Sequence, residues 1–311
     1  MSSGKKILVY SPATVANMVC GFDILGFALD EPADIMEMEL TDQNEVIIEK
    51  DPVYNLPTQP EKNVAGAPLL AMLNDLPQKN SGFRLKITKH IKPGSGIGSS
   101  AASAAGAVIG ANHLLGNWFS KEELVQYAML GEKVATGVKH ADNIAPAIYG
   151  GITLVRSIFP LDIISLPTPN LFVTVVHPQI EVRTADARAI LKQTVLLKDA
   201  IRQWGNIAGL VAGIMKNDHH LIGRSLEDYL IEPTRSILIP GFDDVKARSK
   251  AAGALGGGIS GSGPSIFMLS SSREISLEVE KEMSNVFTSI GIDHATYATR
   301  INPHGVIVKA K

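Results

Sequence analysis

The sequence predicts an α+β protein, because segments with strand and helix periodicity are interspersed without a regular strand–helix–strand period. Residues 35–40 and 82–88 alternate between apolar and polar side chains, as a half-buried strand does, whereas 63–74 and 274–290 have helical spacing. The chain has 311 residues, which suits two domains of ordinary size, or one large domain, with ample core.

The first half is expected to begin with an apolar strand at 7–10 that ends at Ser11-Pro12. A strand at 45–50 resembles a partner for 35–40, because the polar turn at 41–44 separates the two. Three further elements are expected here: a helix from Ala101, a helix that Ser120 and Glu123 begin with a capping box, and a strand at 152–155.

Prolines at 160, 167 and 169 punctuate the chain after this strand, so we predict two domains, 1–166 and 167–311. The expected strands of the second domain are 171–176, 265–269, 295–299 and 305–309. Its expected helices are 184–198, 201–216, 217–229, 243–255 and 274–290.

Composition excludes several classes of protein. The chain is 45% hydrophobic and 19% charged, as globular proteins are, and its formal net charge of −2 gives no electrostatic basis for binding nucleic acid. The single cysteine, Cys20, rules out an internal disulfide and a cysteine zinc cluster, and its apolar neighbours favour a buried, inert thiol. The N-terminus lacks the long apolar region of a signal peptide, and no apolar run is long enough to span a membrane. A cytoplasmic protein without a membrane partner is expected.

A glycine loop is the most informative feature of the chain. Gly94, Gly96 and Gly98 precede Ser99-Ser100 and a run of small residues with helical character. Amides that lack partners at a helix N-terminus and the positive end of the helix dipole face the same point, so the loop predicts an anion site, most simply a nucleotide phosphate. The alternative is a helix start that packs closely on a sheet.

Two other phosphate loops fit less well. The Walker motif needs a lysine that is absent after Gly98. The dinucleotide fingerprint is matched by Gly96, Gly98 and Ala101, but the acidic residues at 122–123 lie at the start of a helix and not at the end of a second strand. The fingerprint leaves an NAD-dependent oxidoreductase as a rival class. A nucleotide-binding regulator without catalytic activity is another.

A second glycine cluster, 256–263, follows a helix and precedes a strand, the reverse of a dinucleotide-binding turn. Two such loops could close around one phosphate group, whereas the alternative for 256–263 is a flexible surface turn. Near the start of the chain, Asn17 and Asp23 are polar residues in an apolar segment. They could reach a small polar substrate or only satisfy local turns.

The other candidate residues are Glu132, His140, Asp142, Arg188 and Arg235. Glu132 and a loop serine could hold Mg²⁺, which prefers a few oxygen ligands together with bound phosphate. Zinc at His140 is disfavoured because no second ligand lies at metal spacing. Asp142 or Asn143 could alternatively cap the helix that follows. The two arginines could grip a carboxylate bidentately or be ordinary surface residues.

Three segments, 11–23, 93–102 and 256–264, resemble in sequence and order the three motifs of the GHMP kinase superfamily. Within it, the chain is similar to the homoserine kinase family at 140–146 (HADNIAP), at Thr184 with Ala187-Arg188, and at 232–235 (EPTR). It departs from that family at Ile97, where leucine is usual, and at Leu191-Lys192, where Leu-Pro is usual.

The resemblance implies ATP and Mg²⁺ as cofactors and L-homoserine as a small-molecule substrate whose hydroxyl is phosphorylated. The ATP-binding residues that it implies are Asn63, Pro93, Gly94, Ser95, Gly96, Ile97, Gly98, Ser99, Ser100, Ala101 and Gly261. The substrate-binding residues that it implies are Asn17, Asp23, His140, Asp142, Arg188 and Arg235. Ser100, or else Ser99, would hold the metal with Glu132, and Asp23, Ser100 and Glu132 are the implied catalytic residues.

The resemblance further implies a two-lobed fold, with an N-terminal lobe like domain 2 of ribosomal protein S5 and a C-terminal ferredoxin-like lobe, and a homodimer. Residues 177–183 contain no aspartate where mevalonate kinase-like relatives have a base, so the hydroxyl proton would pass to the phosphate directly, or Asp23 would orient or accept it. The nearest rival within the superfamily is a mevalonate-type kinase.

Overall fold

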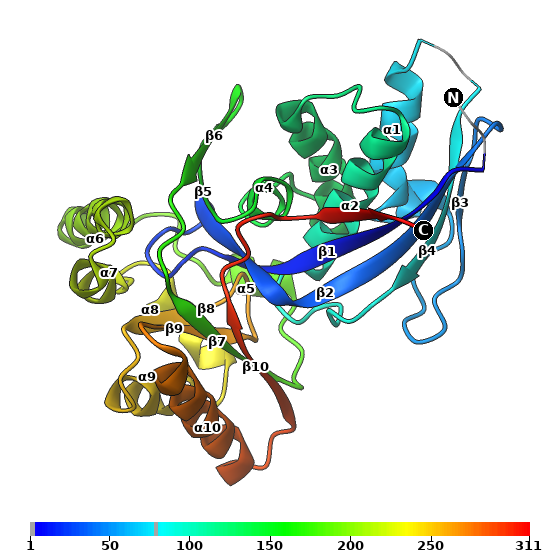
Figure 1. Cartoon of the computed structure of the whole chain (residues 1–311). Helices are drawn as coiled ribbons and strands as arrows, with labels where there is room; N and C mark the ends of the chain where they lie inside the picture. Colours follow the sequence, from blue (N-terminus) through cyan, green and yellow to red (C-terminus); the bar gives the residue numbers. More distant parts are fainter. Residues whose placement is uncertain (1–3, 78–79) are drawn as a thin grey trace.

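The computed structural model describes residues 4–77 and 80–311. Two sheets form the protein, each with helices packed against it (Figure 1). The first three residues of the lysine-containing N-terminal segment lie outside the described residues. Among those described, no helix combines the length and the apolar character needed to cross a membrane.

The first sheet has seven strands, in the order β11-β1-β2-β4-β3, with β5 also paired to β2 and β6 paired to β5. Its strands are β1 (Lys6–Ala16), β2 (Leu25–Thr41), β3 (Val46–Ile48), β4 (Gly82–Thr88), β5 (Ile152–Ile158), β6 (Leu161–Leu166) and β11 (Ile307–Ala310). The expectation that the first strand ends at Ser11-Pro12 was wrong, since β1 continues to Ala16. A register shift between Pro12 and Thr14 lets the strand pass the proline, which has no N–H to donate.

The expected pairing of the 45–50 strand with the 35–40 strand was also wrong. β3 pairs parallel with β4, while β2 pairs antiparallel with β4, so β4 lies between them. Alternation identified the strands, but pairing depends on how the intervening segments cross the sheet. The result is a mixed sheet.

The helices of this lobe are α1 (Gly66–Asp75), α2 (Ser99–Leu114), α3 (Lys121–Thr136) and α4 (Ile144–Tyr149), with the 3-10 turn η1 (Pro60–Lys62). They pack on one face of the first sheet (Figure 1). Small residues let α2 approach β1 and β2 closely: a Cβ on Gly110 would lie 2.3 Å from the Met38 sulfur. The predicted capping box at the start of α3 is confirmed, because Ser120 and Glu123 each bond the other's backbone N–H.

The second sheet is antiparallel, with strand order β10-β7-β9-β8. Its strands are β7 (Phe172–Pro178), β8 (Gly256–Ile259), β9 (Ile266–Ser270) and β10 (His294–Arg300). The helices of this part of the chain are α5 (Thr184–Ala189), α6 (Leu197–Lys216), α7 (His219–Ser225), α8 (Glu232–Arg235), α9 (Phe242–Ala251) and α10 (Arg273–Ser289), with the 3-10 turn η2 (Ser236–Leu238). The helices α9 and α10 share a core with β7, β8 and β9. Along the chain this lobe has a strand, helices, a hairpin, a helix and a closing strand. With the strand order β10-β7-β9-β8, the lobe is ferredoxin-like, as predicted.

Several expected helices differ from the structure at their ends. The 184–198 helix ends at Ala189, the 217–229 helix ends at Ser225 and the 243–255 helix ends at Ala251. The glycines at 256–258 form the buried strand β8, which the sequence reading treated as loop. The domain boundary at residue 166 stays a prediction; the chain passes from one sheet to the other between β6 and β7, and β11 returns to the first sheet.

Candidate active site

A cavity of about 580 Å³ lies where the two lobes meet. Elements from both halves of the chain line it, including the start of α2, the end of α3, α5 and α8. Fourteen of the candidate residues are among its walls: Asn17, Asp23, Pro93, Gly94, Gly96, Gly98, Ser99, Ser100, Glu132, His140, Asp142, Arg188, Arg235 and Gly261. Residues as far apart in sequence as 17 and 261 therefore share one site.

The glycine loop adopts a backbone that other residues rarely tolerate. Gly94, Gly96 and Gly98 have φ values of 76°, 83° and 71°. A Cβ on Gly98 would lie 2.0 Å from the Thr14 hydroxyl oxygen, whereas one on Gly94 would meet open space. The loop ends at the N-terminus of α2, where free amide groups and the helix dipole attract an anion.

The second glycine loop packs directly on the first. The Ser260 hydroxyl donates to the Gly96 carbonyl at 2.8 Å, and the Ser265 hydroxyl donates to the Ser95 carbonyl at 2.7 Å. A Cβ on Gly96 would lie 2.5 Å from the Gly263 carbonyl oxygen. The alternative of a flexible surface turn at 256–263 was therefore wrong.

Ser100 and Glu132 meet across α2 and α3, and the serine hydroxyl donates to the Glu132 carboxylate. Ser99 is occupied elsewhere, because its hydroxyl donates to the Ile91 carbonyl at 2.8 Å. Burial raises the pKa of Glu132, and the hydrogen bond from Ser100 acts in the opposite direction. A hydroxyl and a buried carboxylate beside an anion site fit Mg²⁺, which takes oxygen ligands from protein and phosphate together.

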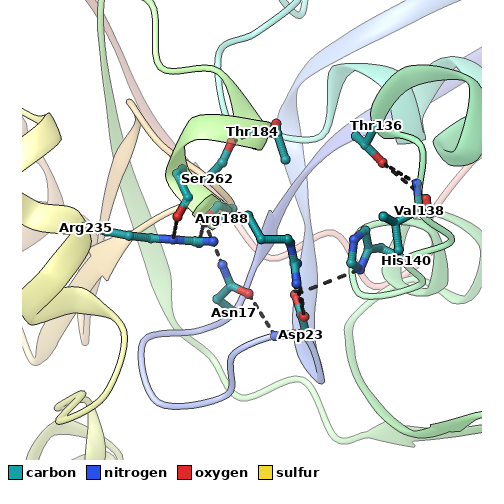
Figure 2. A network of polar contacts seen from close by, with 11 residues as sticks. Asn17, Asp23, Thr136, Val138, His140, Thr184, Arg188, Arg235 and Ser262 are labelled. Atoms are coloured by element: carbon teal, nitrogen blue, oxygen red, sulfur yellow. Dashed lines mark hydrogen bonds and ion pairs between the residues drawn. The ribbon is translucent and has the colours of Figure 1, made fainter. Parts of the chain in front are cut away.

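Asp23 lines the same cavity and lies between Arg188 and His140 (Figure 2). Arg188 grips the Asp23 carboxylate bidentately, with contacts of 2.8–3.1 Å. The Asn17 side chain accepts from the Asp23 N–H at 3.0 Å and donates to the Gly261 carbonyl at 2.7 Å. Asn17 and Asp23 have φ values of 75° and 62°, so this connection between β1 and β2 is strained where it meets the site.

Arg235 is the more buried of the two arginines, with 4% of its surface exposed. Its guanidinium donates to the carbonyls of Ala187 and Gly261 and lies 4.8 Å from the centre of the Phe22 ring. Burial and the neighbouring charge of Arg188 lower the pKa of Arg235 to about 10, so it stays charged at neutral pH. The alternative that Arg235 is an ordinary surface residue was therefore wrong.

Two titratable groups at this end have shifted pKa values. Burial, and then the charges of Asp23 and Glu132, raise the pKa of Asp142 to about 7. Burial lowers the pKa of His140, although Asp23 acts in the opposite direction. Asp142 therefore changes charge near neutral pH in the protein without ligands, and a bound cation would favour its charged form.

Four of the expected ATP-binding residues do not line the cavity: Asn63, Ser95, Ile97 and Ala101. The Asn63 side chain donates to the Pro57 carbonyl and accepts from the N–H groups of Ala65 and Gly66, so it holds the chain at the start of α1. Leu56 and Val64, on either side of this turn in sequence, line the cavity instead. Ser95, Ile97 and Ala101 are buried at their side chains.

The sequence analysis did not identify Lys89, which lines the cavity and contacts the first residues of α2. Its ammonium group is paired with Asp34 and donates to the Ser99 carbonyl and the Ser103 hydroxyl, each at 3.0 Å. Burial lowers the pKa of Lys89, while Asp34 acts in the opposite direction. No local pattern distinguishes Lys89 from other lysines after a strand; only the distant partner Asp34 does.

Other wall residues that the sequence reading did not assign are Thr136, Asn143, Thr184 and Ser262. Thr184 was among the residues of the family resemblance, and that was the one signal that could have found it. Asn143 accepts a hydrogen bond from Thr14 at 2.7 Å beside Gly98, so it supports the loop as well as lining the cavity.

Comparison with known proteins agrees with this geometry. Residues 63–151 match the family model described as GHMP kinases N terminal domain, and residues 210–288 match that described as GHMP kinases C terminal. A homoserine kinase of Chloroherpeton thalassium is 46% identical over 298 residues, covering 92% of this chain and 93% of that protein. A homoserine kinase of Methanococcus maripaludis is 40% identical over 301 residues, covering 96% and 97%.

Among solved structures, a crystal structure of homoserine kinase from Cytophaga hutchinsonii superposes with a TM-score of 0.94 at 47% identity, covering 99% of both chains. A mevalonate kinase of L. major, in complex with R-mevalonate, has a TM-score of 0.72 at 16% identity over 97% of both chains, which shows a shared fold alone. The two-lobed GHMP kinase fold expected from the resemblance is confirmed. With relatives this similar over almost its whole length, the chain belongs to the homoserine kinase family of the GHMP kinases.

Proposed function

We propose that this protein transfers the γ-phosphoryl group of ATP to the side-chain hydroxyl of L-homoserine, giving O-phospho-L-homoserine for threonine biosynthesis. The observation that carries the proposal is the chemistry of the cavity's two ends. One end is an anion site formed by a glycine loop and a helix N-terminus, and the other brings two arginines and two aspartates together. An amino acid offers a carboxylate and an ammonium group, which such a set can bind.

ATP would bind with its phosphates over the loop from Gly94 to Ser100, where the amides at the start of α2 face them. Lys89, whose charge is paired with Asp34, would support the same loop through its hydrogen bond to the Ser99 carbonyl. Ser100 and Glu132 would hold Mg²⁺, which neutralises charge on the β- and γ-phosphates when bound. The adenine would lie toward Leu56 and Val64, so the proposed role of Asn63 is to hold that turn.

L-Homoserine would bind at the other end. Arg235, held by two carbonyls and by Phe22, would take its carboxylate together with Arg188. Asp142 and Asp23 would face its ammonium group, with Asn17 and His140 fixing the hydroxyl-bearing arm. Arg188 must then share its fork between Asp23 and the ligand, or exchange one for the other.

The transfer itself depends on positioning and charge stabilisation more than on covalent work by the protein. Asp23 is an unfavourable base because Arg188 neutralises its carboxylate on both oxygens. We therefore propose that Asp23 orients L-homoserine through its ammonium group. The hydroxyl proton then passes directly to the transferred phosphoryl group. Glu181 is the one carboxylate of residues 177–183, and although it lines the cavity it lies on its exposed side.

The test is ADP release from Mg·ATP in a coupled assay, with L-homoserine, mevalonate, galactose, L-serine or no acceptor in parallel. Release with L-homoserine alone supports the proposal. Release with mevalonate, which has a carboxylate but no ammonium group, would support the kinase activity but contradict L-homoserine as the acceptor. Binding of ATP without release with any acceptor would indicate a regulator.

Matched variants connect the assay to the site. Arg235→Ala should abolish release with L-homoserine, whereas Arg248→Ala, a half-exposed arginine on α9, should leave it unchanged. We also propose, from the family resemblance, that the chain acts as a homodimer.

A further inference from the structure

Phe22 is an aromatic residue in the cavity wall whose position core packing does not explain. It lies between Gly21 and Asp23 in the connection from β1 to β2, and it lines the cavity. Residues 18–20 of the same connection are buried in the core cluster that joins the lobes. Phe22 is only partly buried and belongs to none of the apolar core clusters of the described residues. Its ring must therefore have another function.

Both arginines of the site contact this ring. The guanidinium carbon of Arg235 lies 4.8 Å from the centre of the Phe22 ring, and that of Arg188 lies 5.4 Å from it. Both distances are within the range in which a cation is attracted by an aromatic face. The two guanidinium groups are also close to each other, since burial and then the charge of Arg188 lower the pKa of Arg235. The ring thus offsets part of the repulsion between two like charges.

Hydrogen bonds alone leave both guanidinium groups incompletely fixed. Arg235 donates from Nε to the Ala187 carbonyl and from one Nη to the Gly261 carbonyl, and its other Nη has no hydrogen-bond partner among the described residues. The Nε of Arg188 is buried and also has no partner in that part of the chain. Both Nη atoms of Arg188 bond Asp23. If Asp23 turns to the ammonium group of an acceptor, Phe22 is the contact that still holds Arg188.

We infer that Phe22 is a positioning residue that makes the protein select acceptors with a carboxylate. The inference rests on the proposed function, in which Arg188 and Arg235 bind that carboxylate together. The ring keeps the two guanidinium groups near one point before the acceptor arrives, so one carboxylate can reach both. Without the ring, Arg188 is free to turn toward water, because 39% of its side chain is already exposed.

The test compares L-homoserine with L-homoserine amide, which keeps the hydroxyl and the ammonium group but has a neutral carboxamide in place of the carboxylate. The inhibition constant of the amide against L-homoserine, divided by the KM of L-homoserine, measures selection for the carboxylate. Phe22→Leu and Phe22→Met both remove the ring and keep an apolar side chain. Each should lower this ratio about 10-fold by raising the KM of L-homoserine, with little change in kcat.

Two further variants distinguish positioning from a general effect on the cavity. Phe22→Tyr keeps the aromatic ring and should keep the ratio within about 3-fold of that of the unmodified protein. Phe172→Leu is the matched control, because it removes a ring that contacts Arg300 at 4.5 Å and does not line the cavity. It should leave the ratio unchanged. The dissociation constant of ATP should stay the same in every variant.

An unchanged ratio in Phe22→Leu and Phe22→Met would overturn the inference, even if both ligands bind more weakly, because Phe22 would then only maintain the shape of the cavity. A loss in Phe22→Tyr as large as that in Phe22→Leu would overturn it as well. Absence of turnover of L-homoserine by the unmodified protein would instead contradict the proposed function, so the two failures are distinguishable.

Discussion

The negative charge of Asp142 is expected to favour substrate binding but to destabilise the folded protein, because the carboxyl group is buried. Its carboxyl group has a pKa of about 7 in the folded protein, against an ordinary value of 3.8. Between these two values the folded state binds more protons than the unfolded chain does. The free energy of unfolding therefore falls as pH rises through this window. A binding site for a cation explains why such a group is kept.

Replacing this carboxyl with an amide should separate the two effects. We expect Asp142→Asn to raise the free energy of unfolding at pH 8 by an amount on the order of 2–4 kcal/mol, with a smaller gain at pH 5. The same variant should lower kcat/KM for L-homoserine at least about 100-fold, because the ammonium group loses its counter-charge. Urea unfolding at the two pH values and steady-state kinetics measure both.

The control for this variant is Asp42→Asn, in the exposed turn before β3. It should change neither stability nor kinetics by a comparable amount. A destabilised Asp142→Asn at pH 8 would contradict the assignment. In the unmodified protein, kcat/KM for L-homoserine should decrease below about pH 7 as Asp142 becomes protonated.

A lysine at position 235 tests whether carboxylate binding needs the planar guanidinium group or only a positive charge. Arg235→Lys keeps the positive charge but loses the planar fork that donates to Ala187 and Gly261. We expect KM for L-homoserine to rise about 10- to 100-fold, with the dissociation constant of ATP nearly unchanged. Equal weakening of both ligands would mean that the variant disturbs the whole cavity, and Arg248→Lys is the control for a change of arginine alone.

At the scale of elements, the glycine loop is built from positions with similar backbone angles but different surroundings. Gly94 and Gly98 have φ values of 76° and 71°, so an alanine at either position is strained. Only Gly98 also faces a neighbour, since its Cβ would overlap the Thr14 hydroxyl. The two positions therefore separate backbone strain from the packing of loop against strand.

We expect Gly94→Ala to lower the free energy of unfolding by about 1–2 kcal/mol, the strain of a left-handed alanine. Gly98→Ala should lower it by more, on the order of 3 kcal/mol or above, and should weaken ATP binding much further because the start of α2 moves. Thermal unfolding and ATP titration of the two variants measure this. Equal losses would show that contact with Thr14 does not matter.

The contact between α2 and α3 is expected to make stabilisation of the protein by ATP depend on Mg²⁺. If Ser100 and Glu132 hold Mg²⁺ with ATP, the melting temperature should rise more with Mg·ATP than with ATP and a chelator. At a ligand concentration 100 times its dissociation constant, binding contributes about 2.7 kcal/mol. Differential scanning fluorimetry with and without the chelator measures the difference.

Glu132→Gln should remove the Mg²⁺-dependent part of this increase and leave the part due to ATP alone. Glu122→Gln, on the outer side of the same helix where it bonds Tyr149, should keep both parts. Identical melting temperatures for ATP with and without Mg²⁺ in the unmodified protein would contradict the proposed metal site.

At the scale of the whole molecule, the cavity exists because two lobes with separate sheets meet along the glycine loops. Ser260 and Ser265 bond the first loop from the second lobe, and a core cluster joins β2 and β5 to β7, β9 and α6. The ATP end is therefore formed mainly by one lobe and the arginines by the other. Relative movement of the lobes would change the distance between the two ends.

Much of this arrangement could be predicted from local sequence. The three glycine positions, the capping box of α3 and the acidic and basic residues of the site depend on backbone angles or side-chain chemistry that a short segment specifies. The order of the motifs along the chain then identified the fold through resemblance. These features are local, so their signal is present in the sequence itself.

Contacts between distant segments were decided only by the tertiary structure. The parallel pairing of β3, the continuation of β1 past Pro12, the pairing of Lys89 with Asp34 and the grip of Arg188 on Asp23 join residues that share no local pattern. Asn63 shows the same limit, because its side-chain amide bonds the backbone at 57, 65 and 66 and does not line the cavity. Sequence determined which residues can bind phosphate, metal and amino acid; packing decided which of them face one cavity, because burial and pairing depend on what the rest of the chain brings alongside.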